Sequence, residues 1–231
     1  MIELTPDESR VLGVLVEKAT TTPEQYPLSL NAVVNGANQK NNRDPVLTME
    51  EGDAFEALES LRAKGLVVRV DMAGSRVNKY RHQAGEALHV RGAELAILAE
   101  LLLRGPQTVG ELRGRASRMH PLESLDVVKN MLRALSEREE PLVREIPPAP
   151  GSRAEGYVQL LCPDLHPLDV PAGTYLAPAA GASNPPATGL SARIEALEAE
   201  VATLRDALRR LAAAVGERDP LTGEGPPSGA S

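Results

Sequence analysis

The chain has 231 residues, of which 42% are hydrophobic, and a net charge of −7. This length suits two small domains with extensions, and no apolar run approaches the ~20 residues of a membrane span. The first residues lack the features of a signal peptide, and the single cysteine, Cys162, excludes an internal disulfide framework. We therefore expect a cytoplasmic protein with no membrane partner.

The first 89 residues predict three helical segments followed by a β-hairpin. The sequence Thr5-Pro6-Asp7-Glu8 has the form of a helix-capping box and opens a helix that ends near Lys18. A second helix runs from Leu30 to about Gln39, and Thr48-Met49-Glu50-Glu51 opens a third that stops at Gly65. We expect Phe55, Leu58 and Leu61 to form the core stripe of this third helix. Strands at 66–70 and 77–82 then form a hairpin, or wing.

Residues 90–165 predict the same order of elements. Helices are expected at 93–104, at 108–117 and at 122–138, and strands at 142–146 and 157–161 flank a loop. The core side of the third helix is predicted to contain Leu125, Val128, Met131, Leu132 and Leu135. The repeated order predicts an α+β, mainly helical fold with two tandem winged helix-turn-helix domains, at residues 1–89 and 90–165.

The C-terminal extension contains a heptad pattern. Residues 166–189 are rich in Pro, Ala and Gly and predict a flexible linker, and residues 217–231 predict a disordered tail. Between them, residues 190–216 place apolar side chains at alternating spacings of four and three: Leu190, Ile194, Leu197, Val201, Leu204, Leu208, Leu211 and Val215. Mostly β-branched a positions with Leu at d favour a parallel two-stranded coiled coil, so we expect a dimer. The alternative is an amphipathic helix folded back on its own domain.

The sequence shows no arrangement of residues that is typical of an enzyme. Its four histidines are scattered, without paired metal-ligand spacing, and the glycine-rich phosphate-binding motifs are missing. Cys162 has no base placed beside it, so a partly buried thiol is the simpler interpretation. We expect a non-enzymatic protein without cofactor or metal.

The charges argue both for and against a nucleic-acid ligand. The third helix of a winged helix often enters the major groove, but here its exposed side contains Asp53, Glu56 and Glu59, which repel phosphates. Basic side chains occur elsewhere, in the first wing and in the short helix of the second domain: Arg69, Arg76, Lys79, Arg81, Arg113, Arg115 and Arg118. These can contact DNA or can be ordinary solvated charges.

Four asparagines recur along the second helix at spacings of 4-3-4: Asn31, Asn35, Asn38 and Asn42. Asn is a poor helix former, so the stripe indicates amides used for hydrogen bonding. One interpretation is a semi-buried network that holds the 40–46 loop. The other is a polar patch that, with Lys40 and Arg43, meets phosphate or a protein partner.

Several segments resemble one known family. Asn38-Gln39-Lys40-Asn41-Asn42-Arg43-Asp44-Pro45-Val46 is similar to a signature of the YceH-like family of bacterial proteins. Further similar segments are Lys79–His82, Leu102–Thr108, Gly110–Arg113 and Arg118–His120. The resemblance covers about residues 3–165 and implies two tandem winged-helix domains in a cytoplasmic bacterial protein. Because the family has no established activity, the resemblance implies no ligand.

The sequence thus supports two hypotheses. The first is a dimeric tandem winged-helix protein that binds double-stranded DNA or regulates transcription. Its candidate contacts are Asn31, Asn35, Asn38, Lys40, Asn42, Arg43, Arg76, Lys79, Arg81, Arg113, Arg115 and Arg118. The second is a protein-interaction adaptor that docks a basic partner on the acidic helix 50–64.

Overall fold

The computed structural model describes residues 2–71, 77–148 and 154–166. Residues 1–177 form one compact unit and residues 178–231 a second, so every described residue belongs to the first. The tips of both hairpins, the linker and the predicted coiled coil at 190–216 lie outside the described residues. Within those residues the chain forms seven α-helices and two three-stranded antiparallel sheets, which confirms the predicted mixture of α and β structure.

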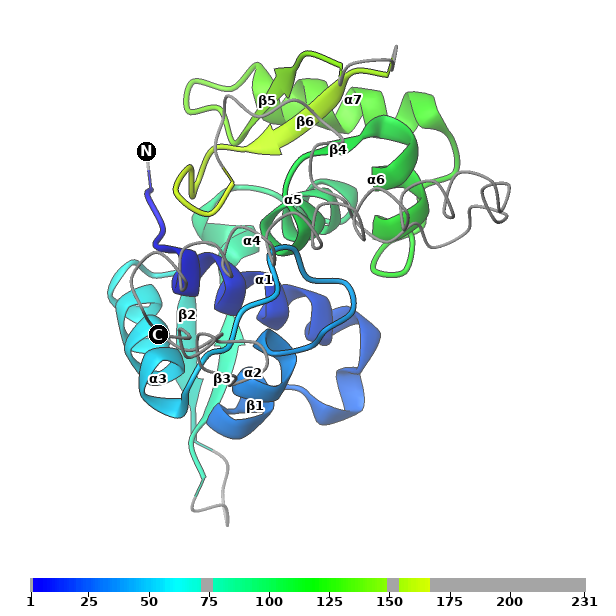
Figure 1. The fold of residues 1–231 in the computed structure, drawn as a ribbon. Coiled ribbons are helices and arrows are strands. Elements are labelled where there is room, and N and C mark those ends of the chain that lie inside the picture. The colour runs from blue at the N-terminus through cyan, green and yellow to red at the C-terminus, as the bar shows by residue number, and fades with distance from the viewer. Residues whose placement is uncertain (1, 72–76, 149–153, 167–231) are drawn as a thin grey trace, which may run out of the picture. The chain divides into compact units, whose positions relative to one another are not determined.

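The first motif, residues 5–82, has the predicted order of helices followed by a hairpin (Figure 1). Its elements are α1 (Pro6–Thr21), a 3-10 turn (Pro23–Gln25), β1 (Leu28–Ser29), α2 (Leu30–Ala37), α3 (Glu51–Ala63), β2 (Val67–Val70) and β3 (Lys79–His82). The sheet order is β1-β3-β2, with Leu28 opposite Tyr80 and Val68 opposite Arg81. The hairpin is therefore extended by a short strand from between the first two helices.

The second motif, residues 90–161, repeats this arrangement. A short helix, α4 (Ala84–Ala87), connects the two motifs. The elements that follow are α5 (Ala93–Arg104), β4 (Gln107–Thr108), α6 (Val109–Ala116), α7 (Leu125–Ser136), β5 (Val143–Ile146) and β6 (Gly156–Gln159). The sheet order, β4-β6-β5, corresponds to that of the first sheet.

The predicted capping box of α1 is present. The Thr5 side chain accepts a hydrogen bond from the Glu8 N–H, and the Glu8 carboxylate accepts one from the Thr5 N–H. The third helix begins later than predicted, because its N-cap is Glu50 rather than Thr48. The side-chain amide of Asn38 pairs with both the N–H and the carbonyl of Met49, at 2.7 and 2.8 Å, and this pairing holds Met49 outside the helix. Helix α7 likewise begins at Leu125, after the N-cap Ser124, rather than at residue 122.

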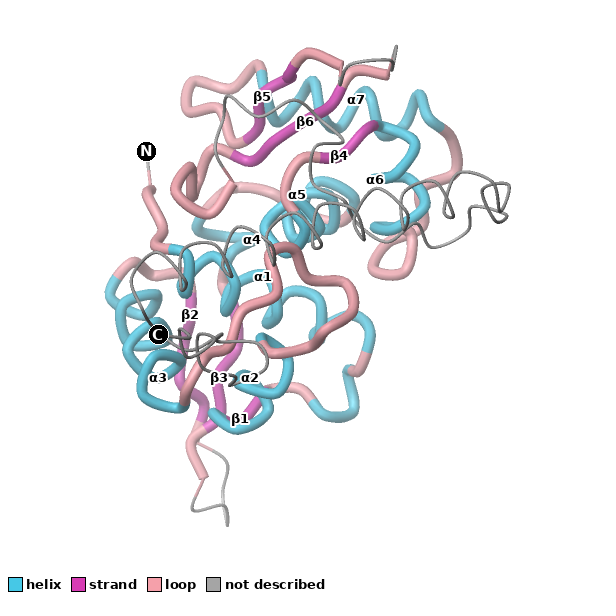
Figure 2. Tube along the Cα trace, viewed as in Figure 1, coloured by secondary structure: helices cyan, strands magenta, loops and turns pink. Residues whose placement is uncertain are grey.

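One hydrophobic core extends through both motifs. Helix α1 packs against α5 so closely that a Cβ built on Gly13 would lie 2.8 Å from Leu103 Cγ. The loop between α2 and α3 also reaches α5, since the Asp44 N–H donates to the Leu103 carbonyl at 2.9 Å (Figure 2). The two motifs are therefore joined by packing as well as by the chain.

Two predicted core residues are at the surface instead. Phe55 is 46% exposed on α3, where Ala54, Leu58 and Leu61 are buried. Leu125 is 45% exposed at the first position of α7. Small alanines fill the α3 side of the core, so Phe55 is turned outward. None of the helices in the described ranges is both long and apolar enough to cross a bilayer.

Candidate functional site

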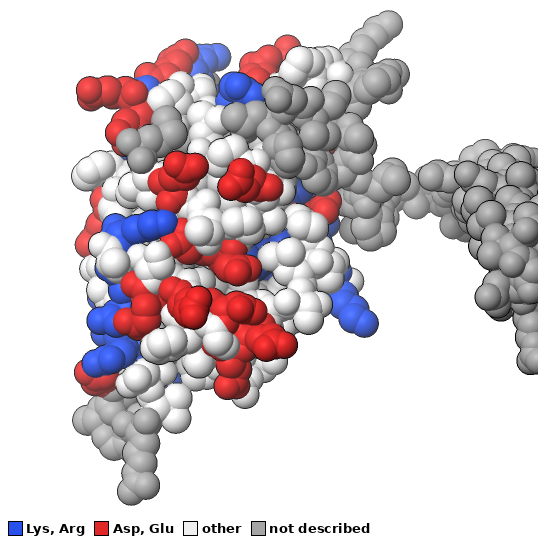
Figure 3. Space-filling view, turned by 60° about the vertical axis from the view of Figure 1, so that its left-hand side comes forward, with Lys and Arg blue, Asp and Glu red and all other residues white. Residues whose placement is uncertain are grey.

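The exposed side of α3 is acidic and includes one aromatic side chain. Phe55, Glu51, Asp53 and Glu56 are all exposed on this helix, and we call these four residues the α3 surface. Figure 3, turned to bring the α3 side of the molecule forward, shows Asp and Glu side chains gathered on this face. Helical spacing puts Glu51, four residues before Phe55, on the same side as the ring, whereas Asp53 and Glu56 lie further round the helix.

The basic side chains of α3 do not neutralise this surface. Arg62 forms an ion pair with Glu59 of its own helix at 2.5 Å. Lys64 lies at the other end of the helix, where its ammonium group contacts the buried Glu8 carboxylate at 2.5 Å. Both cations are therefore paired with carboxylates that do not belong to the α3 surface. A phosphate approaching this face would meet uncompensated negative charge.

The predicted basic contacts of the first hairpin are partly visible. Lys79 is half-buried and Arg81 is exposed on β3, whereas Arg69 on β2 lies 3.6 Å from Asp71. Arg76 lies outside the described residues. Arg69 and Arg81 are thus exposed hairpin cations, of which Arg69 has an acidic neighbour. Lys40, in the loop after α2, is also exposed.

Three predicted arginine contacts, two on α6 and Arg118 in the turn after it, each have an intramolecular partner. Arg113 donates to the carbonyls of residues 122 and 123, at 3.3 and 3.0 Å. Arg115 donates to Gln107 Oε1 at 2.9 Å and forms an ion pair with Glu111 at 3.2 Å. Arg118 lies against two buried carboxylates. These guanidinium groups therefore stabilise the fold whether or not they also meet a ligand.

Two of the four predicted asparagine contacts hold the loop between α2 and α3. Asn38 pairs with Met49, as described above, and Asn42 accepts from Arg104 Nη1 at 2.7 Å. Asn42 has a φ of 61°, a left-handed conformation that Asn tolerates better than most residues. Asn31 and Asn35 are exposed and bond to each other at 2.6 Å. The stripe therefore divides into a structural half and a solvent-facing half.

A charge cluster in which Glu17, Arg43 and Glu100 are buried and Arg118 is partly exposed joins the two motifs, and we call these four residues the interface cluster. Arg43 has a fully buried side chain whose Nη2 lies 2.5 Å from Glu17 Oε2. Arg118 bridges the two motifs, because it contacts Glu17 of α1 and donates to Glu100 Oε2 of α5 at 2.9 Å. Arg43 was predicted as an exposed contact, but the structure places it inside this cluster.

The cluster also fixes the ionisation of Glu17. Burial alone would raise the pKa of its carboxyl group, but the hydrogen bonds and charges of Arg43 and Arg118 outweigh burial and lower that pKa. The remaining Arg43 donors are satisfied by the carbonyls of residues 36 and 42 and by Gln39. No local sequence pattern points to Glu17 or Glu100, since 26 and 101 residues separate Glu17 from its two arginine partners.

Two titratable side chains of kinds that often serve in catalysis, Cys162 and His166, are both buried. No group of three His, Cys, Asp or Glu residues there could hold a metal ion. Cys162 is fully buried, and burial raises the pKa of its thiol. His166 is also buried, and burial lowers its pKa to about 4. Neither group is poised as a nucleophile or base at neutral pH.

Comparison with known proteins identifies the family. The family described as "Protein of unknown function, DUF480" matches residues 4–152. A UPF0502 protein of Geobacter sulfurreducens is 48% identical over 197 residues, which cover 85% of this chain and 88% of that protein. A UPF0502 protein of Leptothrix cholodnii is 43% identical over 218 residues, covering 93% of this chain and 96% of that protein. The resemblance inferred from the sequence motifs is thereby confirmed: the chain belongs to the DUF480, or UPF0502, family of bacterial proteins.

Proposed function

We propose that this protein is a non-enzymatic interaction module, built from two winged helix-turn-helix domains, that docks a basic protein partner on the α3 surface. The topology supports this proposal, because each motif has three helices followed by a hairpin whose second strand pairs with a strand after the first helix. In DNA-binding proteins with helix-turn-helix folds, one helix is presented to the groove of the duplex. Helix α3 occupies the corresponding place in the first motif.

The single observation that carries the proposal is the exposure of Phe55 on a helix whose exposed side chains also include Glu51, Asp53 and Glu56. Aromatic residues, Phe included, are enriched at protein–protein interfaces. The carboxylates of the α3 surface attract a basic partner, accelerate its association and exclude acidic competitors. The same carboxylates oppose nucleic acid, whose phosphates need Lys and Arg.

A second candidate function is the binding of double-stranded DNA. The observation that favours it is the exposure of Arg81 on β3 and of Lys129 and Arg133 on the outer side of α7. However, Asp126 and Glu137 are exposed on the same helix, so its net charge there is close to zero. Arg43, one of the predicted DNA contacts, is buried in the interface cluster and cannot reach a duplex.

The two functions are separated by fluorescence anisotropy titrations of the full chain. One probe is a labelled 14-residue amphipathic peptide of Lys and Leu, and the other is a labelled 20-base-pair duplex. If the protein is an adaptor, the peptide should bind the unchanged chain. Phe55→Ala and Glu56→Lys should each lower the peptide affinity by about tenfold or more. Glu139→Lys, at an exposed position outside α3, serves as the matched control and leaves the affinity within about twofold.

The duplex titration is repeated at several salt concentrations. Each phosphate neutralised by the protein contributes about −0.9 to the slope of log affinity against log salt. The adaptor predicts a slope near zero. DNA binding would be established instead by a slope steeper than about −5 together with a peptide affinity that Phe55→Ala does not change.

The proposal includes self-association through residues 190–216, with the eight heptad positions named above forming a parallel coiled coil. The alignment with the Leptothrix protein leaves out only 7% of the chain, so it reaches into the C-terminal extension. A dimer would present two α3 surfaces to one partner, and linked sites of this kind can exceed the affinity of either alone.

A further inference from the structure

A pocket of about 780 Å³ lies where the first motif is joined to α4 and α5. Its walls include Tyr26, Arg81, His82, Glu86, Arg91 and Leu95. Pockets of about 300–1,000 Å³ are typical of sites that bury small organic molecules. None of the lining residues belongs to α3, so this pocket is separate from the α3 surface.

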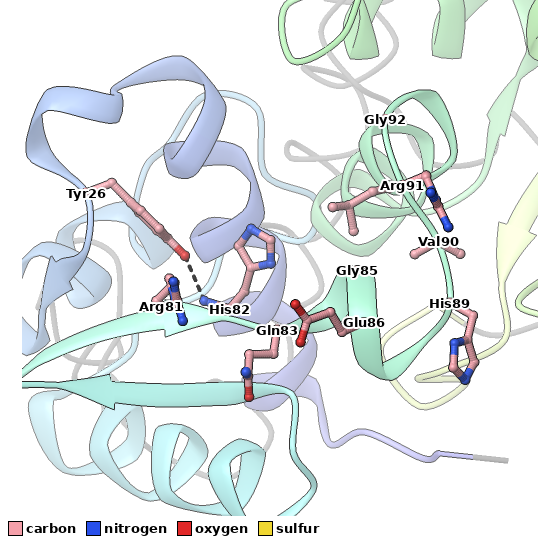
Figure 4. Close-up of a pocket in the computed structure, with 11 residues that line it drawn as sticks. Tyr26, Arg81, His82, Gln83, Gly85, Glu86, His89, Val90, Arg91 and Gly92 are labelled. Carbon is pink, nitrogen blue, oxygen red and sulfur yellow. Dashed lines mark hydrogen bonds between the residues drawn. The ribbon is translucent and has the colours of Figure 1, made fainter.

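One wall of the pocket is held in place by a hydrogen bond. The Tyr26 hydroxyl oxygen accepts from the backbone N–H of His82 at 2.7 Å, and the two rings lie 6.1 Å apart, tilted by 53°. Figure 4 shows this bond, with Arg91 on the opposite side of the pocket. The phenol ring thus presents a fixed apolar face, while its polar end is occupied by the backbone.

The opposite wall is formed by the segment that connects α4 to α5. His89 and Gly92 have positive φ angles, 52° and 53°, which turn the chain back on itself. The Val90 N–H donates to the Gly85 carbonyl at 3.0 Å, so this turn is tied to α4. Leu95, on the first turns of α5, adds an aliphatic side chain to the wall. Both walls are therefore shaped before any ligand enters.

The polar groups of the pocket favour an anion. Arg81 and Arg91 are exposed, and neither forms an ion pair or a side-chain hydrogen bond with any described residue. Glu86 is the carboxylate among the lining residues, so the lining contains two permanent cations and one anion. His82 Nδ1 is buried and has no hydrogen-bond partner within the described part of the chain. A buried polar atom without a partner carries a cost that a ligand can remove.

We propose that this pocket binds a small amphipathic anion, namely a carboxylate or sulfonate attached to an aromatic group. The anionic group is attracted by Arg81 and Arg91, and the aromatic group packs on Tyr26 and Leu95. Unpaired guanidinium groups suit this role because they form charge-assisted, often bidentate hydrogen bonds with planar carboxylates. The proposal does not depend on the function proposed for α3.

The test uses 8-anilinonaphthalene-1-sulfonate as the probe, in a fluorescence titration of the full chain. We expect saturable binding with one site per chain. A lost charge-assisted hydrogen bond corresponds to a weakening of about 10- to 100-fold, so Arg81→Gln and Arg91→Gln should each weaken the probe by at least tenfold. Arg133→Gln removes an exposed arginine outside the pocket and is the matched control, with an affinity within about twofold of the unchanged protein.

A second probe, N-phenyl-1-naphthylamine, has the same aromatic groups without the sulfonate. It should bind the unchanged protein and both arginine variants equally, whereas Leu95→Asp should weaken both probes. Arginine variants that bind the sulfonate as tightly as the unchanged protein would overturn the proposal, as would the absence of saturable sulfonate binding. Saturating sulfonate should leave peptide binding to the α3 surface unchanged, so the two proposals are tested independently.

Discussion

Replacing Glu17 with Gln tests whether the interface cluster holds the two motifs together. The substitution keeps the shape of the side chain, removes its charge and turns an amide NH2 toward a guanidinium group. Glu17 is 2% exposed and lies 2.5 Å from the fully buried guanidinium of Arg43. It also contacts Arg118, which belongs to the second motif.

Removal of one partner from a buried ion pair typically costs about 3–5 kcal/mol, because the other charge is left buried without compensation. Gln still offers one acceptor oxygen to Arg43, so we expect a loss of about 3 kcal/mol in the free energy of unfolding at pH 7. With a urea m-value of about 1–3 kcal/mol/M, the midpoint of unfolding falls by about 1–3 M. This change is large beside the total stability of an ordinary domain, about 5–15 kcal/mol.

The pH dependence gives the substitution a second signature. The folded-state pKa of Glu17 lies below its ordinary value of 4.5, so its contribution is fully present above that value and is lost as pH falls through the folded-state pKa. Urea unfolding at pH 7 and pH 3.5 should therefore show a difference between Glu17→Gln and the unchanged protein that shrinks in acid.

The matched control for this experiment is Glu59→Gln. It breaks an ion pair of the same length, 2.5 Å, in which both side chains are more than 30% exposed. Exposed pairs contribute about 0–1 kcal/mol. A Glu17→Gln effect no larger than that of Glu59→Gln, or one that does not change with pH, would refute the role assigned to the interface cluster.

Three further predictions concern other parts of the chain. Gly13→Ala should lower the free energy of unfolding, measured by thermal unfolding, by about 1–3 kcal/mol, because the new Cβ would meet Leu103 at 2.8 Å. Gly114→Ala, on a helix where the new Cβ would have nothing within 4 Å, should instead raise it by up to about 1 kcal/mol. His166 has a pKa lowered from 6.5 to about 4, so above pH 6.5 it contributes roughly 3 kcal/mol to the free energy of unfolding, and this contribution is lost as pH falls toward 4. His166→Gln should therefore make the free energy of unfolding in urea less dependent on pH across this window. An unchanged pH dependence would contradict the role assigned to His166. A chain ending at residue 189 should sediment as a monomer if residues 190–216 dimerise the protein, and a persisting dimer would exclude that role.

The element order could be predicted because its signals are local. Capping residues three positions apart fix the start of α1, where Thr5 and Glu8 bond to each other. The start of α3 could not be predicted in the same way. Thr48 and Glu51 have the right spacing, but the amide of Asn38, eleven residues away from Met49, holds the chain extended there. A tertiary hydrogen bond therefore overrides a local capping signal.

The burial of Phe55 was predicted wrongly for a related reason. Positions 54, 58 and 61 fit helical spacing as well as positions 55, 58 and 61 do, so the apolar pattern alone does not decide between Ala54 and Phe55. The structure buries Ala54, and α3 packs against α1 and α2. The candidate site changes as a result, since Phe55 becomes part of the exposed α3 surface.

Several residues that carry the family resemblance take part in contacts within the first motif or between the two motifs. Arg43 is buried against Glu17, Asn42 bonds to Arg104, and Arg118 bridges Glu17 and Glu100. Contacts of this kind fix how the first motif packs on the second. The resemblance therefore predicts that members of the family share a packed pair of motifs. A partner docking on the α3 surface and a small anion in the pocket would then bind to parts of a single folded unit, and the Glu17→Gln variant would weaken both by loosening that unit.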